Sequence, residues 1–96
     1  MVRHFVYADL SRRLTDEERL AVFEALETSV PDSGCVGPQK SEEDEVYFTV
    51  DAASDDEASA LATHYINTVI TLAGLDAQYT LTLQTIDGGF RTWTTA

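Results

Sequence analysis

Two histidines and one cysteine are the side chains of this sequence with the widest chemical range. His4 and His64 stand in no metal-ligand spacing, because neither has a second His or Cys at the short intervals that metal sites use. Cys35 has only Lys40 nearby as a basic residue that could stabilise a thiolate. A lone cysteine forms no intrachain disulfide and fits a reducing, cytoplasmic setting. These residues therefore predict no metal site and no cofactor.

The acidic run from Glu42 to Glu45 could hold a divalent cation, but it lacks the alternating spacing and the glycine of a calcium loop. We interpret it as a solvated turn. Gly88 and Gly89 form no phosphate loop, because no helix follows them to receive an anion. The sequence also lacks a nucleophile elbow and a Ser-His-Asp set. The candidates for a catalytic polar group are then His64 and its neighbour Tyr65.

These two residues belong to the clearest element of the chain, a helix between Ser54 and Gly74. Ser54 and Glu57 have capping-box spacing, and three successive acidic residues oppose the positive end of the helix dipole. Gly74 stands where a left-handed terminating residue is expected. Apolar side chains form a stripe at helical intervals, namely Ala58, Leu61, Ala62, Tyr65, Ile66, Val69, Ile70, Leu72 and Ala73.

A second helix precedes it in the chain. Thr15 and Glu18 repeat the capping-box spacing, apolar residues follow at helical intervals, and Pro31 ends the segment. Alternation of apolar and polar residues predicts strands at Val2 to Ala8, Glu45 to Asp51 and Gln78 to Ile86, with a short edge strand at Cys35 to Gln39.

The connections between these elements are also readable. Asp9 to Arg13 is expected to be a loop. Asp87, Gly88 and Gly89 form a tight-turn signal, so Phe90 to Thr95 is predicted to fold back as a further strand. Residues 1–96 then make one domain, with 87–96 as its hairpin-like tail.

The order strand, helix, strand, strand, helix, strand resembles the ferredoxin-like arrangement βαββαβ. The resemblance implies an α+β domain in which two helices cover one face of an antiparallel sheet, here with an extra C-terminal strand. If Cys35 to Gln39 is not a strand, the alternative is a three-stranded sheet with the same two helices.

The net charge of the chain limits the kinds of molecule that it can bind. The chain has 17 acidic and 6 basic residues and a net charge of −11, which argues against direct binding of nucleic acid through its phosphates. The opposite idea, an acidic mimic of DNA, stays open. No signal peptide or membrane-spanning segment is expected, because polar residues interrupt the most apolar window. A single lysine with abundant Thr, Ala and Asp suits a high-GC bacterium, its phage or a salt-adapted organism.

If the helices cover one face of the sheet, the other face is open and unusually free of charge. Aromatic residues on its first and third strands stand where RNA-recognition sheets place base-stacking rings, but the basic signature of those sheets is missing. Between Ala58 and Ile86 the only formal charge is Asp76. We therefore predict an interface that includes Phe5, Tyr7, Tyr47, Thr49, Thr80, Thr82, Gln84, Phe90 and Trp93.

The middle of the chain carries a second resemblance. Gly34, Cys35 and Val36, an acidic turn, Val46 and Phe48, and then Ser54 with Glu57 and Ala58 resemble the cofactor-independent monooxygenase-like dimeric α+β barrels. Proteins of that family have about this length and dimerise through their sheets. The tryptophan common before their second helix is replaced here by Ala52 and Ala53.

Three functions follow as hypotheses. The first is a small cytoplasmic, non-catalytic module that forms a homodimer or docks on a protein partner. The second is an enzyme or carrier for a small hydrophobic molecule, which would need an enclosed cavity reached by His64. The third is DNA mimicry, which would need carboxylates aligned like phosphates.

Overall fold

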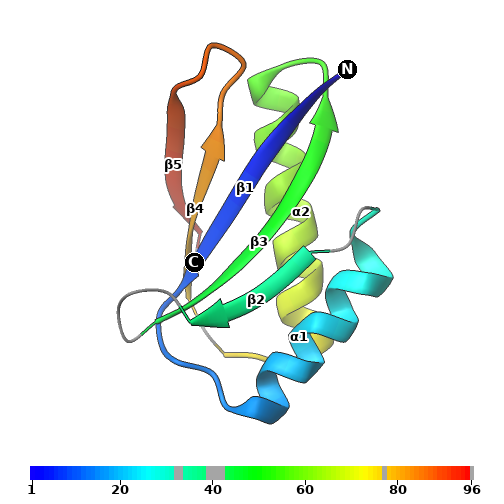
Figure 1. The fold of residues 1–96 in the computed structure, drawn as a ribbon, viewed down its shortest axis with the longest axis vertical. Coiled ribbons are helices and arrows are strands. Elements are labelled where there is room, and N and C mark those ends of the chain that lie inside the picture. The colour runs from blue at the N-terminus through cyan, green and yellow to red at the C-terminus, as the bar shows by residue number, and fades with distance from the viewer. Residues whose placement is uncertain (32–33, 39–42, 77, 96) are drawn as a thin grey trace.

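The computed structural model describes residues 1–31, 34–38, 43–76 and 78–95 (Figure 1). It is an α+β structure in which five strands form one antiparallel sheet, in the order β2-β3-β1-β4-β5, and two helices lie behind this sheet in the view of Figure 1. The elements are β1 (Val2–Leu10), α1 (Asp16–Ser29), β2 (Gly34–Pro38), β3 (Asp44–Ala52), α2 (Asp55–Ala73), β4 (Tyr79–Gln84) and β5 (Phe90–Thr95).

This architecture is compatible with a ferredoxin-like type of α+β fold, with β5 following the six elements of that arrangement. The three-stranded alternative is wrong, because Gly34–Pro38 pairs with β3 from Phe48 to Asp44. Gly34 suits this position, since a Cβ there would meet the carbonyl oxygen of Tyr47. The last residue of the predicted strand, Gln39, lies outside the described residues.

Both helices begin and end where their local signals predict. Thr15 forms both halves of a capping box with Glu18 at the start of α1. Ser54 accepts a hydrogen bond from the Glu57 N–H, 3.1 Å long, at the start of α2. Gly74 ends α2 in the left-handed conformation, with φ 68°.

Strand ends were less predictable. The expected loop from Asp9 to Arg13 is wrong in its first two residues, because β1 continues to Leu10 by pairing with the start of β4. The tail behaves as predicted: β5 pairs with β4 along its whole length, from Phe90 opposite Gln84 to Thr95 opposite Tyr79. Gly88 takes a positive φ of 90° in the turn between them.

The core lies between the sheet and the helices. Alternate residues of the three central strands point into it, and the stripe of α2 covers them. The largest fully buried apolar side chains are Phe48, Leu10, Leu26, Ile66, Leu81 and Leu83.

The sheet divides at one end. β1 pairs with β3 from Val2 to Asp9, whereas it pairs with β4 only from Val6 onwards. Figure 1 shows the β4–β5 hairpin leaving β1 at this point. Backbone pairing therefore holds the N-terminal half of β1 in the sheet through β3 alone.

Candidate interaction surface

The face of the sheet away from the helices, called here the open face, collects most of the predicted interface. The burial pattern and strand register place eight of the nine predicted residues on it, and Trp93 on the opposite side. The eight are Phe5, Tyr7, Tyr47, Thr49, Thr80, Thr82, Gln84 and Phe90.

Three aromatic rings form the centre of the β1–β3 part of this face. Tyr47 stacks on Phe5 with ring centroids 6.2 Å apart and lies 5.2 Å from Tyr7. Partial burial, with the nearby Tyr7 as a smaller cause, raises the pKa of the Tyr47 hydroxyl above its ordinary value. Phe5 is still 37% exposed, so the cluster leaves apolar aromatic surface in contact with solvent.

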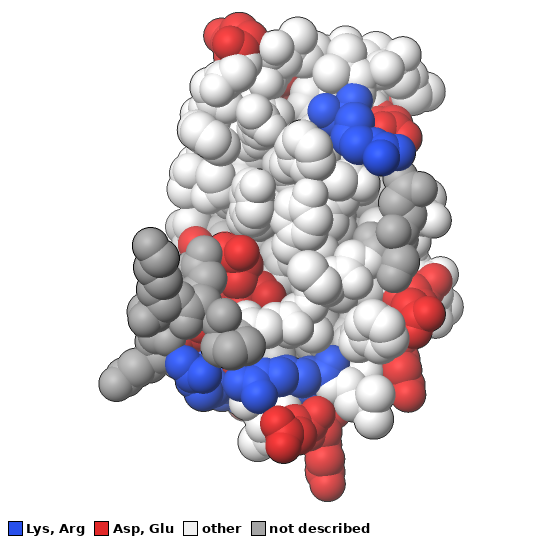
Figure 2. All heavy atoms as spheres, in the orientation of Figure 1, with Lys and Arg blue, Asp and Glu red and all other residues white. Residues whose placement is uncertain are grey.

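Among the described residues of the open face, charged side chains lie only at its two ends. Arg3 and Asp51 form an ion pair of 3.4 Å at one end, and Asp9 and Glu45 lie opposite each other near the other end. Figure 2 shows this face from the front, with a broad band free of charged atoms between them. In a chain of net charge −11, this band is the most neutral part of the sheet.

The neutral segment from residue 58 to 86 does not make one surface. Its strand, β4, contributes to the open face, whereas the polar side of α2 faces away from the sheet. The sequence did not reveal this separation, because the relative orientation of a helix and a strand depends on packing.

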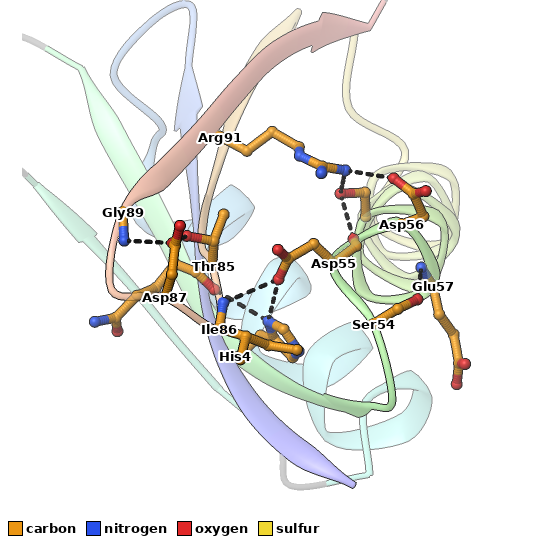
Figure 3. A network of polar contacts seen from close by, with 12 residues as sticks. His4, Ser54, Asp55, Asp56, Glu57, Thr85, Ile86, Asp87, Gly89 and Arg91 are labelled. Atoms are coloured by element: carbon orange, nitrogen blue, oxygen red, sulfur yellow. Dashed lines mark hydrogen bonds and ion pairs between the residues drawn. The ribbon is translucent and has the colours of Figure 1, made fainter.

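Trp93 lies between β5 and α2. Its indole Nε1 donates to Thr63 Oγ1 at 3.1 Å, and its ring packs against the core. Two positions earlier, Arg91 Nη1 donates to Asp56 Oδ1 at 2.9 Å and to Ser59 Oγ at 3.2 Å (Figure 3). The helix-facing side of β5 is thereby tied to α2.

The two catalytic candidates are neighbours whose ring centroids lie 5.8 Å apart, but they line different depressions. His64 is exposed and borders an open depression of about 280 Å³ that is lined by α2 alone, through His64, Asn67, Thr68, Thr71 and Leu72. Tyr65 lies on another side of the helix, edge-on to Phe48 with ring centroids 6.4 Å apart. The depression at His64 is therefore not the enclosed cavity that the enzyme hypothesis requires.

The acidic turn contains a buried carboxylate that sequence reasoning missed. Glu43 is exposed and Glu42 lies outside the described residues, but Asp44 is fully buried, so the prediction of a solvated cluster is wrong at this position. Asp44 accepts a hydrogen bond from the Leu14 N–H and forms an ion pair of 3.2 Å with Arg19. The available signal was its alternation with Val46, which gives it an inward position on β3.

His4 is also buried, at 1% exposure, beside the point where the sheet divides. Its Nδ1–H donates to the Gln84 carbonyl oxygen at 3.0 Å and lies 3.7 Å from Asp55 Oδ1. Asp55 in turn accepts the Ile86 N–H at 3.0 Å (Figure 3). His4 thus joins β1, α2 and the β4–β5 connection from inside the structure.

Within the described ranges, no three His, Cys, Asp or Glu residues are grouped to hold a metal ion. The helices found there are also too short or too polar to span a membrane. No protein family model matches the chain, and neither does any curated protein or solved structure. The open face must therefore be judged on its own chemistry.

Proposed function

We propose that this protein is a non-catalytic interaction module that forms a homodimer by packing two open faces together. The observation that carries the proposal is the uncharged, aromatic-bearing band of the open face in a chain of net charge −11. Removing apolar aromatic surface from water lowers the free energy of the system, and a surface without charge can pack against its own copy without electrostatic repulsion.

The open face offers an area at the small end of the range for specific interfaces. Five strands spaced about 4.8 Å apart and about six residues long cover roughly 24 Å by 20 Å. This footprint of roughly 480 Å² is below the ~800 Å² that each partner buries in an interface of standard size. Phe5, Tyr7 and Tyr47 then provide the rigid anchors that dominate the energy of such interfaces.

The fold supports the same proposal. We take the first six elements as a ferredoxin-like unit, since their order and the sheet order β2-β3-β1-β4 are those expected for it. The resemblance of residues 34–58 to dimeric α+β barrels points to sheet packing as the mode of association.

The test is sedimentation of the purified protein and of two variants. The unmodified protein is expected to be a dimer at high micromolar concentration. Tyr47→Glu with Thr82→Glu adds two charges to the open face and is expected to give a folded monomer at low micromolar concentration. Ala60→Glu with Thr71→Glu adds the same two charges at exposed positions of α2 and should leave the dimer intact.

A monomeric unmodified protein at high micromolar concentration would refute the homodimer. The open face would then be assigned to a different protein partner. Equal loss of dimer in both double variants would show that total charge, and not the open face, controls association.

A further inference from the structure

The outer edge of β5 has a regular set of backbone groups with no partner among the described residues. The Thr85 N–H donates to the Gly89 carbonyl oxygen, and the register continues from this pair along β4 and β5. Since hydrogen-bonded pairs alternate in antiparallel strands, Arg91 and Trp93 direct their backbone groups to β4. Those of Phe90, Thr92 and Thr94 point to the outer edge.

This edge lacks the usual protection against pairing. Proteins block edge strands with proline, charged side chains, bulges or shortness. The opposite edge strand, β2, has five residues and includes Gly37 and Pro38. In contrast, β5 has six residues, no proline and one charged residue, Arg91, whose side chain is tied to α2.

We propose that the outer edge of β5 pairs antiparallel with β5 of a second copy, centred on Thr92, so that one sheet continues across a two-fold axis. This edge is distinct from the open face, and the proposal goes beyond the homodimer described above. Six backbone hydrogen bonds would form, because Thr92 would pair with Thr92 of the second copy and Phe90 with Thr94 in both directions.

The register follows from the orientation of the side chains. Residues opposite each other in antiparallel strands point to the same face, so even-numbered positions must meet even-numbered ones. Centring on Thr92 satisfies this rule within residues 90–94. It also places Arg91 opposite Trp93 of the second copy, twice by symmetry, on the side that faces the helices.

This pairing is favourable for a second copy in particular. Arg91 keeps its guanidinium on the helix side through Asp56 and Ser59 (Figure 3), where the indole of a second Trp93 would lie within reach of a cation–π contact. The edge carries no acidic residue, so two copies of this acidic chain can meet there without like charges facing each other. Self-complementarity of this kind is what a two-fold interface requires.

The area is small, so the edge contact should be weaker than the open-face contact. We therefore test it by amide hydrogen exchange in the Tyr47→Glu, Thr82→Glu background, which removes the open-face contact. On raising the concentration from low micromolar to millimolar, the amides of Phe90, Thr92 and Thr94 should exchange more slowly. When nine in ten chains are paired, the slowing is about tenfold, because only unpaired chains exchange. Arg91 and Trp93 should keep their rates, because their amides already bond to β4.

Two substitutions with matched controls complete the experiment. Thr92→Pro removes a central outer N–H and should abolish the concentration dependence, whereas Thr92→Ala removes the same side chain and should retain it. Arg91→Ala keeps every backbone donor and should weaken pairing by several-fold to about tenfold. Asp56→Ala removes one of the two contacts that hold Arg91 on the helix side and should weaken pairing less than Arg91→Ala does, because the contact with Ser59 remains.

Exchange rates at Phe90, Thr92 and Thr94 that do not change up to millimolar concentration would overturn the proposal. Equal pairing by the proline and alanine variants, both folded by circular dichroism, would also overturn it. If Thr92→Pro does not fold, the Arg91→Ala variant tests the proposal in its place, and pairing as strong as that of the background protein would overturn it. Failure of the open-face dimer leaves this test unaffected, since the test uses a background without it.

Discussion

Asp44 is the residue whose replacement should affect stability most clearly. Its carboxylate is fully buried, holds the Leu14 N–H before α1 and pairs with Arg19 on α1, so it ties the start of β3 to the start of the first helix. Asp44→Ala removes both contacts at once. Asp44→Asn keeps a side-chain oxygen as an acceptor but removes the negative charge.

The expected loss can be worked out from these contacts. Breaking a buried ion pair from one side costs about 3–5 kcal/mol, and the lower half applies because the Arg19 side chain is 26% exposed. Leaving the Leu14 N–H without its acceptor costs about 1–3 kcal/mol. This cost is partly included in the cost of breaking the ion pair, so the two values are not added. We expect Asp44→Ala to lower the free energy of unfolding by about 3–4 kcal/mol and Asp44→Asn by about 1–2 kcal/mol. A chain of 96 residues has only about 5–14 kcal/mol in total.

Urea unfolding measures this loss, followed by circular dichroism and by Trp93 fluorescence. The Tyr47→Glu, Thr82→Glu background removes the contribution of the proposed open-face dimer to the free energy of unfolding. Unchanged m-values would show that stability alone has changed. A loss below about 1 kcal/mol for Asp44→Ala would refute the reasoning, because the buried pair would then contribute nothing. Equal losses for both variants would show that the charge of Asp44 is irrelevant.

Three further predictions concern charge and the tail. Arg12 lowers the pKa of Glu18 to about 2, so the stabilisation by this carboxylate is complete above pH 4.5 and is lost as pH falls towards 2. Glu18→Gln should accordingly be less stable than the unmodified protein near neutral pH, with a difference in thermal melting that disappears towards pH 2. Added salt, or a change from pH 7 towards pH 5, should raise the melting temperature modestly, because both relieve the self-repulsion of a chain with net charge −11. Melting curves that do not change between low and near-molar salt would contradict this. Thr63→Val should cost about 0.5–1.5 kcal/mol and shift Trp93 fluorescence, because the indole N–H loses its acceptor; an unchanged spectrum would place the tail elsewhere.

Features fixed by neighbouring residues in the sequence were predictable. α2 carries its start at Ser54, its apolar stripe and its stop at Gly74 within one segment, and all three appear in the structure, except that Leu72 of the predicted stripe is exposed. The open face was also predictable, because the period of two in a strand separates Tyr47 and Thr49 from Val46 and Phe48 without knowledge of the rest of the fold.

Features that depend on contacts between residues far apart in the sequence were not predictable. β1 extends to Leu10 because β4 is long enough to pair with it there. Asp44 is buried because Arg19 and Leu14 come close to it from another part of the chain. Its alternation with Val46 indicates an inward position, but the acidic run does not reveal these two partners. Trp93 faces α2 and not the open face, because the turn after β4 sets which side each residue of β5 occupies.

The position of β1 has a consequence for synthesis of the chain. β1 is synthesised before its two partners, yet it occupies the centre of the sheet, and these partners end at Ala52 and Gln84. At about 5–20 residues per second, β1 waits for seconds before its second edge can pair. Until β3 has emerged, the apolar residues and both edges of β1 stay open to other nascent chains, whereas α1 can form as soon as it emerges. The sheet is consequently completed only after β5 has been synthesised, long after β1.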